Sequence, residues 1–583
     1  MRHPPSLAAA ANQAAAVGDP PASTRGAPPL ASWLRWCDRY RWGLLAAVLL
    51  LYLLGFNGQW RIGPDSAEHV VVAQHLAAGQ GYTHPTGHQR FINPGLSYLT
   101  AATFRWFGPD QFLPIHILML LMGLGALGLT YTLIRLRFDR PTAVAVTCML
   151  AIAEKFYRYA FQVLTDMPFL IGALLFLVGH ELIARRGRGA VASGLALMAA
   201  GTAVMALFRS VVLTFLAAVV LALAASIVRG PRRLRSAGVA MVVLLALLAV
   251  RAADPRLSAF HQTVDDEARV LRVVSDLGRF AATLAHAAYR TGPKLLTETL
   301  AEAVFGLDLS PVLSLPLALV LIGVGLALVR VRLLWGCIAG VFLMQWLMFI
   351  ATDRYVLVLL PLLALGWWRA MGWADTRLPG RWAPCVVIAM LVLWITPNLI
   401  RVGAFIREQR QVPFLASYEE GKYVALEALA QQILQHAGPN DYVIAADAPQ
   451  LVYFTGLRVL GPDSLNLHRG KARTLKRLAE ADRIWLVQPP DGPLRKKLKR
   501  LALEPGRIVA RVERPRGEPF LLQEVALSPR IKKRIERRFQ PARKSARNKA
   551  DKPATNADAP SKAPRRQRPA PASQPAQPGS DAS

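Results

Sequence analysis

The stretch WGLLAAVLLLYLLGFNGQWRIGPDSAEH, residues 42–69, joins a long apolar run to a dense polar segment. The apolar part, 42–56, predicts a membrane span, because a hydrocarbon core about 30 Å thick requires a long apolar helix. The polar part opens the segment 63–95, which carries Asp65 and Glu68 three residues apart. A polar segment of this density directly after a span predicts an outer loop with a functional role.

The composition places the chain among polytopic membrane proteins. Its 583 residues are 53% hydrophobic and only 18% charged, and the mean hydropathy is +0.30. A soluble protein of this length carries more charge and lacks repeated apolar runs of nearly twenty residues. The four cysteines have neither metal-ligand nor redox spacing, and each lies in or beside an apolar run: Cys37, Cys148, Cys337 and Cys385.

The apolar runs predict a mainly α-helical bundle of about eleven transmembrane helices. Short basic connectors all fall on one side and acidic loops on the other, which places the N-terminus on the inner, cytoplasmic side. The predicted spans are 42–56, 112–134, 141–153, 167–183, 191–207, 211–228, 237–250, 311–329, 333–350, 355–368 and 383–400.

The chain is predicted to have four parts. Residues 1–31 form a disordered cytoplasmic leader, and 32–400 form the membrane domain, with a first outer loop at 57–111 and a long outer loop at 251–310. A small α/β domain, 401–530, follows on the outer, extracytoplasmic side, with a helix at 418–436 and strands at 442–445, 483–487, 507–512 and 520–525. Residues 531–583 form a disordered basic tail.

The net charge of +32 resembles that of a nucleic-acid-binding protein. Much of it lies in short connectors, where lysine and arginine fix the topology, and in the tail. We therefore predict membrane lipids as partners and no nucleic acid. Only the tail could bind a polyanion or lipid headgroups.

Charged side chains at span ends are costly, so a set of them on one side predicts a site or a set of ion pairs. The predicted outer side supplies Asp65, Glu68, Glu154, Arg158, Asp166, Arg209, Asp353 and Arg354. Structural roles explain each local motif equally well. Asp65 and the aspartate of VLTDMPFL, 163–170, could stabilise helix starts, and Arg354 with Tyr355 could be interfacial anchors.

A divalent metal is the one cofactor for which the outer loops hold candidate ligands. Asp65, Glu68 and His69 are spaced so that they share one face of a helix, which makes Glu68 and His69 weak candidate ligands. His84 and His88 follow in a loop rich in glycine and proline, where surface histidines are the ordinary interpretation.

Three motifs together resemble the GT-C glycosyltransferases, in the branch of the protein mannosyltransferase-like enzymes and the lipid A aminoarabinose transferase. PDSAEH, AAGQGYTHPTG and NPGLSYL, within 64–99, resemble the first outer loop of that branch. TDMPF resembles its second acidic motif, and DRYVLVLLPLL resembles its Arg-Tyr span opening. DAPQLVYFTGLRVL, 447–460, is similar to a segment in the periplasmic domains of such proteins. Relatives often have two adjacent acids in the first motif, whereas here Ser66 follows Asp65.

The resemblance implies an inverting transfer of a sugar from a polyprenyl-phosphate donor of the undecaprenyl-phosphate type to a lipid, glycan or protein acceptor. It also implies a bacterial inner membrane, with the reaction and the C-terminal domain on the periplasmic face. Asp65 would then be the general base and Asp166 a second catalytic residue that orients the acceptor or an arginine. The predicted substrate-binding residues are Glu68, Arg158, Arg209, Arg354 and Tyr355, with Arg354 the first choice for the phosphate.

Two other functions fit a membrane protein with charged outer loops. A transporter or flippase of lipid-linked sugars would use the acidic loops as gates, and its spans would carry charges or breaks near their centres. A non-catalytic membrane scaffold would bind partners through its outer domain, and Asp65 would be dispensable. A transfer assay with purified protein separates these possibilities.

Overall fold

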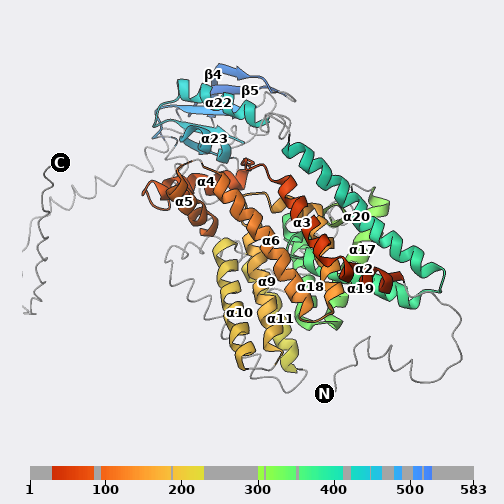
Figure 1. The fold of residues 1–583 in the computed structure, drawn as a ribbon. Coiled ribbons are helices and arrows are strands. Elements are labelled where there is room, and N and C mark those ends of the chain that lie inside the picture. Colours follow the sequence, from red (N-terminus) through yellow and green to blue (C-terminus); the bar gives the residue numbers. More distant parts are fainter. Residues whose placement is uncertain are drawn as a thin grey trace, which may run out of the picture. The chain divides into compact units, whose positions relative to one another are not determined.

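The computed structural model describes residues 29–84, 93–109, 111–185, 188–209, 211–228, 300–307, 310–349, 353–410, 422–446, 448–461, 480–488, 503–514 and 518–527, with a few isolated positions besides. Within the unit Met1–Leu527, long helices form a bundle and a small sheet carries its own helices (Figure 1). The predicted leader (apart from its last three residues), the span at 237–250, most of the loop 251–310 and nearly all of the tail lie outside the described residues.

The predicted helix bundle with a small α/β domain is confirmed, and ten of the predicted spans coincide with helices. These are α3 (Arg41–Gly55), α6 (Leu113–Arg135), α7 (Arg140–Ile152), α9 (Asp166–Ile183), α10 (Arg188–Phe208), α11 (Val212–Val228), α17 (Pro311–Ala327), α18 (Leu333–Phe349), α19 (Leu360–Arg377) and α20 (Trp382–Gln409). By length and composition, α6, α9, α10, α17 and α20 can each cross a membrane. The protein is therefore a multi-pass membrane protein.

Two span boundaries differ from those predicted. The span predicted at 355–368 begins at Leu360, because residues before it form the 3₁₀ helix η4 (Asp353–Val356). The last helix, α20, continues to Gln409 instead of ending at 400, and Pro397 lies inside it. Apolarity marks the part of a helix that lies in lipid, and it says nothing of a polar extension beyond the membrane.

Basic connectors that the sequence places on one side of the membrane meet in the structure. Arg332, after α17, forms a two-pronged ion pair with Glu181 near the end of α9, at 2.8 and 2.9 Å. Arg137, after α6, donates to the carbonyl oxygen of Val331 at 3.3 Å. These contacts join the connectors after α6, α9 and α17 at one end of the bundle. The helix α2 (Pro29–Arg39), not among the predicted elements, packs on α7 and α19.

Helices α9 and α10 approach each other unusually closely, as neighbouring antiparallel helices (Figure 1). Two glycine pairs lie at their contact, Gly172 with Gly201 and Gly179 with Gly194. A Cβ atom on Gly172 would lie 2.8 Å from the carbonyl oxygen of Gly201. Small residues permit this approach, and van der Waals packing of the two backbones then holds the pair together in lipid.

The first prediction concerns this contact. Gly172→Ala should lower the free energy of unfolding by about 1–3 kcal/mol, the usual cost of an atom forced into a packed interface. Gly128→Ala in α6 is the matched control, since a Cβ there meets no other atom within 4 Å. The thermal midpoint in detergent checks both variants. Equal midpoints for the two would show that the close approach does not contribute to stability.

The C-terminal α/β domain is built on a five-stranded sheet of order β2-β1-β3-β5-β4. β1 (Tyr442–Ala445) pairs in parallel with β2 (Arg458–Leu460) and β3 (Ile484–Gln488), whereas β5 (Phe520–Leu527) is antiparallel to β3 and β4 (Leu503–Val512). The four predicted strands are present. β2 was not predicted, because three residues show no period. The predicted helix corresponds to α22 (Lys422–His436), and α23 (Ala448–Thr455) packs on α4 (Pro64–Ala77).

Candidate functional site

Asp65 lies in the first turn of α4, the helix that follows the first span. Pro64 is the first residue of the helix and Gly63 precedes it in an extended conformation. The Ser66 hydroxyl accepts a hydrogen bond from the Gly63 N–H at 2.9 Å and donates to the Gly63 carbonyl at 3.0 Å. Ser66 therefore fixes the helix start, and the helix dipole favours the Asp65 carboxylate there.

Asp166 is the first residue of α9, and its side chain is only 2% exposed. Its Oδ1 accepts a hydrogen bond from Nη1 of Arg209, which follows the end of α10. Asp166 begins α9 and Arg209 follows the end of α10, so the antiparallel α9–α10 contact places both residues at the same, open end of the helical hairpin. A buried carboxylate needs such a partner, since an unpaired buried charge is costly.

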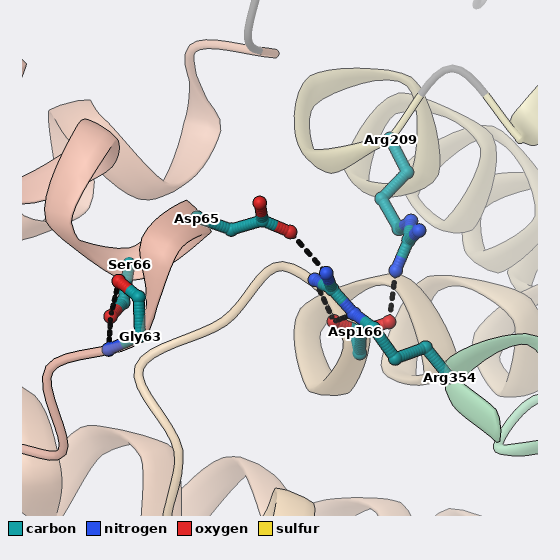
Figure 2. A network of polar contacts seen from close by, with 6 residues as sticks. All are labelled: Gly63, Asp65, Ser66, Asp166, Arg209 and Arg354. Carbon is teal, nitrogen blue, oxygen red and sulfur yellow. Dashed lines mark hydrogen bonds and ion pairs between the residues drawn. The ribbon is translucent and has the colours of Figure 1, made fainter. Parts of the chain in front are cut away.

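Arg354, in η4, connects the two aspartates (Figure 2). Its Nη1 donates to Oδ2 of Asp65, while Nη2 and Nε donate to Oδ2 of Asp166 at 2.8 and 3.2 Å. Asp65, Arg354, Asp166 and Arg209 thus form an alternating network of charges from four separate chain segments. We call these four residues the charged network.

The ion pairs of the network shift the pKa values of Asp65 and Arg354. Partial burial by itself would raise the pKa of Asp65, but the charge and hydrogen bond of Arg354, with smaller effects of His69 and Arg209, hold it below its usual value. Burial would likewise lower the pKa of Arg354, and the two aspartates raise it well above its usual value. Asp65 is therefore ionised at neutral pH. Its side chain is 55% exposed, so water also stabilises the charged carboxylate.

His69 lies one turn after Asp65 and is buried. Its Nδ1 is 3.0 Å from the Ser97 hydroxyl of α5 (Gly95–Phe107). Burial lowers the pKa of His69 to about 4, against an opposing effect of Asp65, so the imidazole is neutral at pH 7. His69 thus ties α4 to α5. Glu68, on the same helix, is half-buried, and its proposed role in substrate binding stays a prediction.

Arg158 lies in a second group of charges, on α8 (Glu154–Tyr159). Its Nε is 2.7 Å from Oε1 of the buried Glu154, and Lys155 is 3.7 Å from Glu302 of α16 (Leu300–Phe305). Because α16 contacts both α8 and η4, this group is joined to the charged network through one short helix. The predicted binding of substrate by Arg158 stays a prediction, as does that of Tyr355, whose side chain is not described.

The donor chemistry of the network does not fit a metal ion. Both aspartates are bridged by a guanidinium, whose positive charge repels a cation, and Nδ1 of His69 is engaged with Ser97. Among the described ranges, no three His, Cys, Asp or Glu side chains gather as a metal site would require. The weak candidates Glu68 and His69 thus gain no third ligand there, and we derive no chemical step through a metal.

Aromatic side chains connect the segment before α4 with the C-terminal domain. The Trp60 ring stacks on Phe112, with centroids 4.6 Å apart, and meets the Tyr453 ring of α23 edge-on at 4.8 Å. No local sequence pattern points to Trp60, because its partner Tyr453 lies almost 400 residues away. The only signal was that Tyr453 falls within the family-like segment 447–460. The stack places the C-terminal domain directly beside the helix that carries Asp65.

The second prediction tests this stack. Tyr453→Ala should lower the thermal midpoint, because one aromatic pair contributes about 0.5–1.5 kcal/mol beyond its burial. Its loss also loosens α4, which should slow any reaction that uses Asp65 severalfold. Tyr453→Phe keeps the ring and is the matched control, with a rate expected near that of the wild type. Midpoint and initial rate are measured on the same preparations. A loss of rate in Tyr453→Phe equal to that in Tyr453→Ala would instead implicate the hydroxyl group.

The arrangement suits a reaction in which negative charge moves. An ionised, half-exposed carboxylate can accept a proton, and the arginine next to it can stabilise an anion. Asp166 and Arg209 hold that arginine from the buried side. The network therefore combines a candidate base with a candidate anion-binding group, at the ends of apolar helices.

No protein-family model and no curated protein sequence matches the chain. Among solved structures, it is similar to that of ArnT from Cupriavidus metallidurans in the apo state. The identity is 13% and the TM-score 0.49, over 84% of this chain and 98% of that chain. The same protein bound to undecaprenyl phosphate gives 14% and 0.47, over 83% and 98%.

A third similar structure is the Archaeoglobus fulgidus oligosaccharyltransferase in complex with Zn and sulfate. Its identity is 14% and its TM-score 0.47, over 76% of this chain and 67% of that chain. ArnT and this enzyme are both members of the GT-C superfamily, which the sequence also resembles.

Proposed function

We propose that this protein is a membrane glycosyltransferase that moves a sugar from a polyprenyl-phosphate donor to a lipid, glycan or protein acceptor. The observation that carries this proposal is the charged network. Asp65, Asp166, Arg209 and Arg354 come from segments up to 289 residues apart, yet their side chains are in direct contact. A set of ion pairs that only stabilised helix ends would need fewer partners. It would also not need a half-exposed carboxylate such as that of Asp65.

Each residue of the network has a role in this proposal. Asp65 is the general base that takes the proton of the acceptor hydroxyl or amine as that group attacks the anomeric carbon with inversion. Arg354 neutralises the phosphate as it leaves. Asp166 and Arg209 are positioning residues, since Asp166 holds the Nε edge of Arg354 and Arg209 holds the other oxygen of Asp166.

The site's place in the bundle supports a lipid-linked donor. Asp166 begins a helix that can cross a membrane, and Arg209 follows the end of another. A phosphate held by Arg354 would leave its prenyl chain beside these apolar helices, in hydrocarbon. We place this end of the bundle, with the α/β domain, on the periplasmic side of the inner membrane, because the opposite end carries the basic connectors.

The direct experiment is a transfer assay with the full chain, purified and reconstituted in lipid. A labelled undecaprenyl-phosphate sugar is supplied with a panel of lipid, glycan and peptide acceptors. Formation of a labelled product, with the anomeric configuration inverted by NMR, is the expected result. The configuration decides between an inverting displacement and a retaining one. A product with retained configuration would exclude Asp65 as a base in a single displacement.

The same preparation tests the two other functions. A flippase would move the labelled lipid-linked sugar between leaflets of a vesicle without forming product, which a membrane-impermeant reagent would detect. A scaffold would do neither. Either result, obtained with protein that unfolds cooperatively and so is folded, would overturn the proposal of a transferase.

A further inference from the structure

Arg354 has two acidic partners of very different accessibility. The side chain of Asp166 is 2% exposed, whereas that of Asp65 is 55% exposed. The Nε edge and Nη2 of Arg354 are directed to the buried partner, and only Nη1 reaches the exposed one (Figure 2). The contact with Asp65 is thus the one that a ligand from outside can replace.

The formal charges of the network cancel, since it holds two carboxylates and two guanidinium groups. Asp166 shares both guanidiniums, because Arg209 also binds it. If Asp65 leaves Nη1, the buried aspartate keeps its partners and Arg354 keeps its orientation. An incoming phosphate can therefore take the place of Asp65 on Arg354 without leaving a buried charge unpaired.

We propose that Asp65 and the phosphate of the lipid donor compete for the Nη1 edge of Arg354, so that binding of the donor releases the base. This inference rests on the proposed function. Before the donor binds, the base is covered by the arginine. After the donor binds, the carboxylate of Asp65 turns to the acceptor, and Nη1 of Arg354 pairs with the phosphate that will leave.

The chemical step keeps the charge around Arg354 constant. The bond between the anomeric carbon and the phosphate oxygen breaks, and its electron pair stays on the phosphate. The acceptor oxygen or nitrogen forms the new bond to that carbon, and its proton passes to Asp65. One negative charge disappears from Asp65 as one appears on the lipid phosphate. Arg354 lies beside Asp65 and beside the phosphate, so it stabilises the new negative charge on the phosphate.

Asp65→Asn isolates this competition, because the amide keeps the shape of the carboxylate and removes its charge. The variant should bind undecaprenyl phosphate, the product lipid, more tightly than the wild type does. A charge-assisted contact that no longer has to be broken corresponds to about a 3- to 30-fold lower Kd. Because Asp65 is half-exposed, the substitution leaves the buried part of the network paired.

The experiment measures the Kd of undecaprenyl phosphate for the full chain in detergent. Asp38→Asn is the matched control, because Asp38 pairs with Arg140 through two hydrogen bonds, at 2.8 and 3.1 Å, away from the network. Arg354→Lys keeps one charge but cannot bridge both aspartates, and should bind the lipid about tenfold more weakly. The control variant Asp38→Asn should have the same Kd for undecaprenyl phosphate as the wild type.

An unchanged or higher Kd for Asp65→Asn, in protein whose wild type transfers sugar, would overturn the competition and leave the proposed function standing. Wild-type protein that neither binds undecaprenyl phosphate nor transfers sugar would overturn both. A lower Kd in the Asp38→Asn control equal to that in Asp65→Asn would assign the effect to overall charge, and would also overturn the competition.

Discussion

Asp65→Asn is expected to lower the rate of sugar transfer by about 10²–10⁴-fold, the range over which a positioned general base accelerates a reaction. The substitution removes the proton acceptor and leaves the start of α4 to Ser66 and Gly63. The thermal midpoint should therefore change little. Initial rates at saturating donor and acceptor, beside the midpoint of the same protein, check both statements.

The control for this variant is Asp38→Asn, which removes one aspartate paired with an arginine elsewhere in the bundle and should leave the rate unchanged. Turnover of Asp65→Asn equal to that of the wild type would remove Asp65 from the mechanism. An equal loss in both variants would point to a general effect of charge on the protein.

The pH dependence of the wild type follows from the lowered pKa of Asp65. A base with a depressed pKa stays ionised until the pH falls below the ordinary aspartate value of about 3.9. The acid limb of kcat/KM should thus lie below pH 4 if Asp65 is the base of the free enzyme. The ion pair's contribution to stability is present above the unfolded-state pKa and is lost as the pH falls through the folded-state pKa.

Arg354→Gln is expected to have the second large effect, about 10²–10³-fold on transfer, the loss typical when one group that stabilises a developing anion is removed. It should also lower the thermal midpoint by several degrees. Asp166 loses one of its two guanidinium partners, and a buried carboxylate with less compensation destabilises the folded state. Rates and midpoints are measured in the same detergent as for the wild type.

Arg140→Gln serves as the control for that variant, because Arg140 also forms two hydrogen bonds to an aspartate, Asp38, but outside the network. Its side chain is 45% exposed, and exposed pairs contribute at most about 1 kcal/mol. Normal turnover in Arg354→Gln together with a lowered midpoint would make Arg354 a structural residue only.

Local sequence was sufficient for most of the fold and for the identity of the network residues, though not for their contacts. Long apolar runs predicted ten of the helices, since lipid imposes length and apolarity on a span. The same signal could not find η4 or the polar end of α20, which lie where apolarity no longer decides. The short strand β2 is defined only by pairing with β1, and three residues carry no period.

For the site, the decisive inference was which side of the membrane each loop lies on. Asp65, Asp166, Arg209 and Arg354 were all placed on the outer side, and the structure brings them into contact. The sequence could not show that Arg354 lies between the two aspartates, nor that Arg158 pairs with Glu154 instead. Those pairings depend on helix rotation and packing, such as the glycine contact of α9 with α10, which no local pattern encodes.

The α9–α10 hairpin also bears on how the protein is made. Asp166 and Arg209 are 43 positions apart, whereas Arg354 follows Asp166 by 188. The two helices can pack together through their glycines soon after both have left the ribosome. The carboxylate of Asp166 and the guanidinium of Arg209 can then enter the bilayer as a neutralised pair. We therefore expect the pair of Asp166 and Arg209 to form early during synthesis, and Arg354 to join it only after a further 145 residues have been made.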